Sequence, residues 1–192
     1  ADVERPDAQI HFTPAAGRLN ARGNLTTVPG TTATVCNLRP TSRGSVHVRT
    51  PFPDYPPAIR ANYLTTEADR RVMIDAVKRV REIFASRVFD GYRDAEIKPG
   101  VNCTSDGQIL EFIRREAESV YHPVGTCAMG PGEDAVVDHR LRVHGLEGLR
   151  IADASVFPSI IGGNTNAAVV MIAEKASDMI LGRPPLPPDS LE

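Results

Sequence analysis

The residues best suited to chemistry lie in two stretches of this 192-residue chain, 121–130 and 151–168. In the first stretch, Pro123 biases the backbone of His122 toward an extended conformation, and Gly125 keeps the next turn small. Because imidazole titrates near neutral pH, a histidine fixed beside a pocket can accept a proton from a substrate hydroxyl. The alternative is a core histidine with satisfied hydrogen bonds, which is the commoner role of an arbitrary histidine.

The second stretch predicts a strand, a turn and a helix in succession. Residues 149–152 form a short apolar run that predicts a buried strand, and Asp153 stands at its end. A Gly-Gly turn follows, and then residues 164–166, Asn-Thr-Asn, supply helix-capping side chains. Apolar residues recur at helical spacing from Ala167 until Gly182 stops the helix. The amino end of such a helix suits an anion, or a group that becomes anionic during a reaction.

Length and composition predict a globular protein with neither a nucleic-acid-binding surface nor a membrane span. The hydrophobic fraction of 41% and the charged fraction of 24% are ordinary, and the length suffices for one domain or for two unequal pieces of larger domains. A net charge of −2 with scattered basic residues argues against a nucleic-acid surface, and no apolar run is long enough to span a membrane. The three cysteines lack the spacing of a zinc site or a disulfide framework, so we expect no metal and a cytoplasmic location.

The elements before His122 begin with a loop-rich region and a predicted hairpin. Residues 1–33 are rich in turn formers, with a Gly/Thr/Pro cluster near their end. Residues 34–38 and 45–49 predict two strands, and the turn-forming residues 39–44 join them. The proline-rich segment 51–57 cannot donate a continuous ladder of hydrogen bonds, so it predicts an irregular connection.

Two amphipathic helices are predicted next. The first follows Thr65 and Thr66 and runs for about twenty residues, with an acidic first turn. Residues 105–108, Ser-Asp-Gly-Gln, match a capping box that opens the second helix. Its predicted buried side consists of Ile109, Leu110, Phe112, Ile113 and Ala117. The second helix leads the chain directly to His122, and residues 89–104 between the two helices predict a loop.

The two chemical stretches resemble the carboxy-terminal signature of the glucose–methanol–choline (GMC) family of flavin-dependent alcohol oxidoreductases, choline-dehydrogenase-like branch. The match begins with His-Pro-Val-Gly-Thr-Cys-Ala-Met-Gly at residues 122–130. Further matching residues, in order along the chain, are 137–138, 141–145, 148–155, 163–167 and 171–175. Weaker similarity covers residues 38–44 and 62–64, so the resemblance extends over most of the chain.

The resemblance implies an α/β fold with an α+β substrate layer. We expect a mixed, largely antiparallel substrate-binding sheet with covering helices, plus the closing strand and helix of an FAD-binding Rossmann-like domain. Residues 1–128 then belong to the substrate-binding domain and residues 129–182 to the FAD-binding domain. Residues 183–192 are proline-rich and predict an extended tail.

The resemblance also implies two catalytic residues for alcohol oxidation. His122 is the expected acceptor of the hydroxyl proton, while hydride passes from the carbinol carbon to flavin N5 and leaves an aldehyde or a ketone. Asn164 is the expected hydrogen-bond partner of the substrate oxygen. Family members carry either His or Asn at this second position, so His122 is expected to be the single proton acceptor. A capping role alone remains open for Asn164.

The same resemblance assigns four residues to FAD. Asp153 and Ala154 are expected to meet its ribityl and pyrophosphate part, although Asp153 could also cap the following turn. Asn166 and Ala167 lie where free N–H groups of the helix would reach the flavin pyrimidine edge. There they would stabilise the negative charge that develops as hydride arrives.

The expected partners are a small-molecule alcohol and the amino-terminal FAD-binding portion of the same enzyme, as a separate or cleaved chain. The family's Gly-rich flavin-binding turn lies near the amino terminus of a much longer polypeptide. Here only residues 130–135 fit such a fingerprint, and no predicted strand precedes them. We therefore expect the chain to be the carboxy-terminal third of the enzyme.

Two other functions remain open at this point. One is a flavin-containing hydroxynitrile lyase of the same fold, in which the histidine is an acid and base. Such lyases usually carry histidine at the second position, so Asn164 speaks against this function. The other is a non-catalytic binding fragment that keeps the signature without the flavin.

Overall fold

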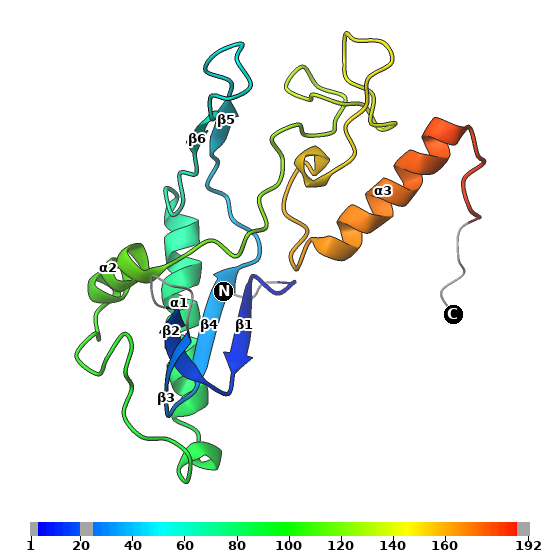
Figure 1. The fold of residues 1–192 in the computed structure, drawn as a ribbon. Helices are drawn as coiled ribbons and strands as arrows, with labels where there is room; N and C mark the ends of the chain where they lie inside the picture. The colour runs from blue at the N-terminus through cyan, green and yellow to red at the C-terminus, as the bar shows by residue number, and fades with distance from the viewer. Residues whose placement is uncertain (1–3, 20–24, 188–192) are drawn as a thin grey trace. The chain divides into compact units, whose positions relative to one another are not determined.

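The computed structural model describes residues 4–19 and 25–187, and these form two compact units. The first unit comprises Ala1–Gly44 and Ala61–Val120, and the second comprises Ser45–Arg60 and Tyr121–Glu192. Both helices and strands are present, as the α/β prediction requires (Figure 1). All strands described in the two units belong to two-stranded antiparallel pairs.

Strands in the first unit replace the predicted loop and hairpin. β1 (Ala8–Thr13) pairs with β4 (Thr32–Asn37), and β2 (Ala16–Leu19) pairs with β3 (Leu25–Val28). The prediction that residues 1–33 are loop-rich is therefore wrong for the described part, while residues 1–3 and 20–24 lie outside it. The predicted hairpin is also wrong, because the strand that contains Thr34 pairs with β1 and not with residues 45–49.

The long helix of the first unit covers the β1–β4 pair. α1 (Glu67–Phe84) lies beside both strands, which run next to each other in Figure 1. The ring of Phe12 in β1 lies 6.4 Å from the ring of Phe84, centroid to centroid. β1 alternates apolar and polar residues along its length, a strand signal that the sequence reasoning missed.

Both helices predicted in this unit are confirmed. Thr66 caps α1 by accepting a hydrogen bond from the N–H of Asp69 at 3.3 Å. α2 (Asp106–Glu116) opens with the complete capping box of Ser105 and Gln108. The two helices share a core of Ile74, Ile109 and Ile113. Ala117 was wrongly assigned to the buried side, because it ends the helix as its exposed C-cap.

The predicted turn residues 39–44 instead bind the first turn of α1. The carboxylate of Asp69, which is only 3% exposed, accepts hydrogen bonds from the backbone N–H groups of Thr41 and Ser42, each at 2.8 Å. The Thr41 hydroxyl adds a third bond at 3.0 Å, and Asn37 adds a fourth at 3.3 Å. A buried carboxylate of α1 thus directs this segment away from a hairpin turn.

The predicted loop between α1 and α2 is confirmed, and one arginine of α1 makes several of the contacts that hold it. It contains a short 3₁₀ helix, η1 (Arg87–Phe89). Arg81 pairs with Glu96 at 2.8 Å and donates to the carbonyls of Gly100 and Cys103 at 3.2 and 2.7 Å. These bonds tie the loop to the end of α1.

In the second unit, β5 (Ser45–His47) pairs with β6 (Ala58–Arg60). The proline-rich residues 51–57 form the irregular connection between them, as predicted. The sequence reasoning missed β6, whose three residues are too short to show a period.

The core of the second unit lies under α3 (Asn166–Leu181). Its members are Val137, Leu141, Val156, Phe157, Ile172 and Ala176. The helix is confirmed, and Gly182 ends it with a left-handed φ of 67°. The buried strand predicted at residues 149–152 is wrong, because this segment makes one isolated bridge, Arg142 to Arg150, and Leu149 is 49% exposed. A short 3₁₀ helix, η2 (Ala154–Val156), follows.

Beyond α3, residues 183–187 adopt neither helix nor strand, and residues 188–192 of the predicted tail lie outside the described part. Across residues 4–19 and 25–187, no helix combines the length and the apolar character that crossing a bilayer requires.

Candidate active site

His122 contacts the start of α3, which lies more than forty positions further along the chain. Its Nδ1 is 3.2 Å from the hydroxyl of Thr165, within hydrogen-bond distance. The imidazole is half-buried, and Nε2 makes no hydrogen bond within the described residues. Tyr121, immediately before the histidine, has a positive φ of 58°, a conformation that non-glycine residues seldom adopt.

Backbone hydrogen bonds hold the two chemical stretches side by side. The N–H of Cys127 donates to the carbonyl of Ser155 at 2.9 Å, and the N–H of Met129 donates to that of Val156 at 2.8 Å. Gly125 has a φ of 85°, and a Cβ there would lie 3.2 Å from the carbonyl oxygen of Phe157. Glycine is therefore required at this close approach, and the loop after His122 is fixed against the residues that lead to α3.

A third segment, residues 136–137, makes backbone hydrogen bonds with the end of the first chemical stretch. The N–H of Val136 donates to the carbonyl of Ala128 at 2.9 Å, and the N–H of Gly130 donates to that of Val137 at 3.0 Å. Val137 is fully buried. The loop that carries His122 is thus anchored to the core of the second unit.

The amino end of α3 differs from those of the other two helices. Thr165 is its N-cap but has helical backbone angles, φ −83° and ψ −16°, and its side chain makes no capping bond. The first-turn N–H groups of an α-helix have no partner within the helix. Here Asn166 and Ala167, both exposed, open the helix without a side-chain cap. This end of α3 therefore keeps donors that an acceptor could use.

Asn164 lies next to the Thr165 contact and is exposed. Because Thr165 is the N-cap of α3, the alternative in which Asn164 is the cap does not hold. Within the described part of the chain, its carboxamide makes no hydrogen bond, so both its donor and its acceptor remain available.

Asp153 caps a turn, as the alternative interpretation of this residue predicted. Its Oδ1 accepts a hydrogen bond from the N–H of Ser155 at 2.7 Å, and it is the N-cap of η2, which begins at Ala154. The carboxylate is exposed and keeps one oxygen without a partner in the described ranges. Capping therefore leaves room for a further hydrogen-bond donor.

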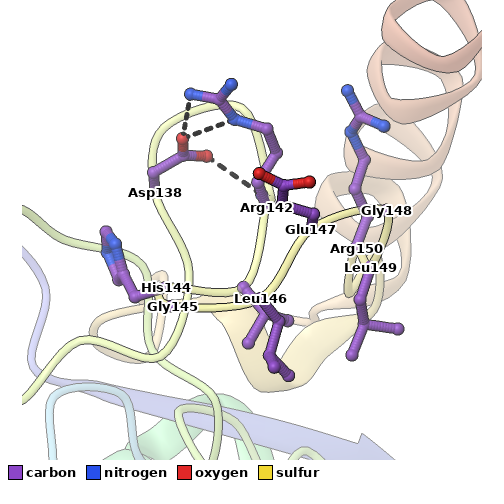
Figure 2. A pocket seen from close by; sticks show the side chains of 10 residues that line it. Asp138, Arg142, His144, Gly145, Leu146, Glu147, Gly148, Leu149 and Arg150 are labelled. Atoms are coloured by element: carbon purple, nitrogen blue, oxygen red, sulfur yellow. Dashed lines mark hydrogen bonds and ion pairs between the residues drawn. The ribbon is translucent and has the colours of Figure 1, made fainter.

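An open hollow of about 440 Å³ lies elsewhere in the second unit (Figure 2). The loop 142–150 and Asp138 line it, and none of the six predicted site residues does. Arg142 donates to the Asp138 carboxylate through its backbone N–H at 2.9 Å and through Nε at 2.8 Å. The backbone bond from Arg142, with help from its guanidinium, lowers the pKa of Asp138 well below the ordinary range. This ion pair shapes the loop and is separate from the His122 contact.

Thr165 is the site residue that sequence reasoning missed, because the Asn-Thr-Asn triplet was interpreted as a set of caps. The signal that could have found it is a hydroxyl between two amides in a stretch expected to meet the histidine loop. No group of three His, Cys, Asp or Glu side chains gathers at a metal-binding distance within residues 4–19 and 25–187.

The arrangement suits proton transfer to or from an imidazole next to a helix end that can stabilise negative charge. One nitrogen of His122 is engaged by Thr165 and the other is available, while a free carboxamide and an uncapped helix end lie next to that contact. This combination suits a substrate hydroxyl at the imidazole and an anionic or electron-accepting group at the helix end.

Curated relatives match nearly the whole chain. The oxygen-dependent choline dehydrogenase of Klebsiella pneumoniae is 46% identical over 187 residues, 97% of this chain and 34% of that protein. That of Escherichia coli O127:H6 is 47% identical over 182 residues, 95% of this chain and 33% of that protein. The chain therefore spans about a third of the length of these relatives and corresponds to their carboxy-terminal part.

Solved structures that are similar to this chain are also oxidoreductases of which it covers about a third or less. Pyridoxine 4-oxidase from Mesorbium loti is similar with a TM-score of 0.81 and 31% identity, over 94% of this chain and 35% of that one. An FAD-dependent oxidoreductase from Chaetomium thermophilum is similar with a TM-score of 0.73 and 34% identity, over 80% and 27% of the two chains.

The family model described as GMC oxidoreductase matches residues 40–173, which is more than half of the chain and includes both chemical stretches. Together with the relatives, this match shows that the chain belongs to the GMC oxidoreductase family.

Proposed function

We propose that this chain is the carboxy-terminal part of an FAD-dependent alcohol oxidoreductase in which His122 accepts the hydroxyl proton of the substrate. The observation that carries the proposal is the 3.2 Å contact between His122 Nδ1 and Thr165 at the amino end of α3. It supports the proposal because the imidazole of His122 lies beside the start of α3, where Asn164 and the uncapped helix end are also found.

The proton transfer uses the ring nitrogen that the chain leaves open. The substrate O–H bond breaks and its proton passes to Nε2 of His122, while the electron pair left on oxygen forms the carbonyl bond. The carbinol carbon loses hydride in the same oxidation, and the product is an aldehyde or a ketone. Nδ1 is held by Thr165 throughout, so the ring stays oriented as it gains charge.

Asn164 is proposed to orient the substrate oxygen. Its carboxamide is exposed and adjacent in sequence to the residue that contacts His122. An amide N–H donated to the substrate oxygen stabilises the negative charge that develops there during proton and hydride loss. With Asn at this position, His122 is the single side chain that takes the proton.

FAD, when bound, supplies the acceptor of the hydride. Its fit to the chain rests on the amino end of α3, where the N–H groups of Asn166 and Ala167 have no side-chain cap. These donors are proposed to hold the flavin pyrimidine edge. Asp153 and Ala154 are proposed to meet the ribityl and pyrophosphate part, for which Asp153 keeps one carboxylate oxygen free.

The whole enzyme is proposed to complete the fold with an amino-terminal FAD-binding portion. Residues 1–128 would contribute to a mixed, largely antiparallel substrate-binding sheet with covering helices, and residues 129–182 would close the FAD-binding domain. Four apolar side chains of α3 support a covering partner, since each is more than half exposed: Val170, Met171, Ile180 and Leu181. Exposed apolar surface of this kind marks an interaction site.

The substrate class follows from the names of the relatives. They include choline dehydrogenases, a pyridoxine 4-oxidase and a fungal aryl-alcohol oxidase, which act on different alcohols. We propose a small-molecule alcohol as the substrate, and choline is the first compound to test because the curated relatives named above carry its name.

The test uses the full-length protein that contains this chain, purified and mixed anaerobically with choline and with other primary alcohols. The expected result is a flavin absorbance spectrum that bleaches when an alcohol is added. Cyanohydrin cleavage without bleaching would instead identify the protein as a hydroxynitrile lyase. A colourless protein with no affinity for FAD would indicate a non-catalytic binding fragment.

A further inference from the structure

Thr165 occupies a capping position without capping. In α1, the hydroxyl of Thr66 accepts a bond from the backbone N–H of Asp69, and in α2 the hydroxyl of Ser105 accepts one from Gln108. Both caps have extended backbone angles, with ψ of 152° and 154°. Thr165 instead has ψ −16°, and its hydroxyl lies 3.2 Å from His122 Nδ1. Of these three N-cap hydroxyls, only that of Thr165 accepts no bond from the backbone of its own helix.

The Thr165 hydroxyl contacts the histidine in place of the capping bond that would stabilise α3. An N-cap hydroxyl that bonds its own helix stabilises the helix start, and α3 lacks this bond. Thr165 is also 7% exposed, so its hydroxyl needs a partner within the protein, and His122 supplies that partner. The bond therefore ties the histidine to the helix end on which the proposed active site depends.

We infer that Thr165 is a positioning residue that holds His122 in the tautomer with hydrogen on Nδ1. This inference rests on the proposed function, in which Nε2 must carry a free lone pair to accept the substrate proton. A neutral imidazole has hydrogen on one nitrogen only. If Nδ1–H donates to the Thr165 hydroxyl oxygen, Nε2 is unprotonated and ready to act as the base.

The same bond strengthens during the reaction. When Nε2 takes the proton, the ring becomes a cation, and the Nδ1–H donor to Thr165 becomes part of a charge-assisted hydrogen bond. Such a bond is stronger in the transition state than in the ground state, so its loss lowers kcat more than it raises KM.

The test compares Thr165→Val with Thr165→Ser in the flavin-loaded full-length enzyme. Valine removes the hydroxyl at similar size, whereas serine keeps it. We expect Thr165→Val to lower kcat roughly 10- to 100-fold with little change in KM, since hydrogen bonds to charged groups are stronger than neutral ones. Thr165→Ser should restore most of the rate. Thr104→Val, at an exposed position in the first unit, is the control for the substitution itself.

A second readout is independent of turnover. In enzyme labelled with ¹⁵N-histidine, the ring-nitrogen chemical shifts of His122, assigned by its loss in His122→Gln, report which nitrogen carries hydrogen. The expected result is Nδ1–H in the wild type and in Thr165→Ser, with a shift toward Nε2–H in Thr165→Val. An Nε2–H tautomer in the wild type, or identical spectra in Thr165→Val, would overturn the inference. If no alcohol reduces the wild-type flavin, the proposed function fails separately, and the spectra still decide the role of Thr165.

Discussion

Replacing Asp69 by asparagine should remove a pH-dependent part of the stability of the first unit. Burial alone would raise the pKa of Asp69, but hydrogen bonds from Ser42 and Thr41 outweigh burial and lower it from 3.8 to about 2. At about 1.36 kcal/mol for each pH unit, this difference is worth about 2 kcal/mol of unfolding free energy. Because the folded-state pKa is depressed, the stabilisation is fully present above about pH 5 and is lost as pH falls toward 2.

Asp69→Asn keeps one acceptor oxygen but turns an NH₂ group toward the bonds that the carboxylate accepts from Thr41 and Ser42. Urea unfolding followed by circular dichroism at 222 nm, from pH 7 to pH 2, gives the unfolding free energies of both proteins. The difference between them should be greatest above pH 5 and should shrink by about 2 kcal/mol by pH 2. Asp75→Asn, at an exposed position of the same helix, is the matched control. A constant difference across this range would refute the role assigned to the Asp69 carboxylate.

Three further substitutions test the second unit. Gly125→Ala should destabilise it by about 1–3 kcal/mol in urea unfolding, because φ is 85° there, whereas Gly91→Ala, with open space at its Cβ, should have little effect. The low pKa of Asp138 implies that its carboxylate stabilises the loop that contains Arg142 at pH values above the ordinary aspartate range, and that this stabilisation is lost on acidification. Asp138→Asn should therefore abolish the acid-induced rise in hydrogen exchange at the Arg142 amide. Asn164→Ala should slow flavin reduction by alcohol in stopped-flow absorbance at least about tenfold while FAD content stays constant, and an unchanged rate would exclude its proposed role.

The helices were predictable because their signals are local. Thr66, Ser105 and Gln108 make their capping bonds within three residues, so the pattern of residue types already contains the interaction. The end of α3 at Gly182 is equally local, since a left-handed residue there needs no distant partner.

The strand pairing was not predictable from these patterns, because its causes are distant in sequence. β4 pairs with a strand that begins at Ala8, and the segment after β4 is captured by Asp69 of α1. A single acidic residue in a first helical turn looks like ordinary complementation of the helix dipole. Its burial under residues 41–42 appears only in the folded chain. The segment 149–152 misled in another way, since apolar composition predicted burial where Leu149 is half exposed.

The candidate site was predicted in part. The motif placed His122 and the start of α3 in one site, and the structure brings His122 to Thr165. Sequence patterns assign Thr165 to capping because capping is the commonest task of such a residue at a helix start. Its actual bond spans 43 positions and therefore leaves no periodic or local trace in the sequence.

The most direct test of the central claim is the rate of anaerobic flavin reduction by alcohol in the full-length enzyme, compared between wild type and His122→Gln. If His122 accepts the hydroxyl proton, the variant should bind FAD normally but reduce it at least about 100-fold more slowly at neutral pH. Reduction at the wild-type rate by His122→Gln would contradict the account.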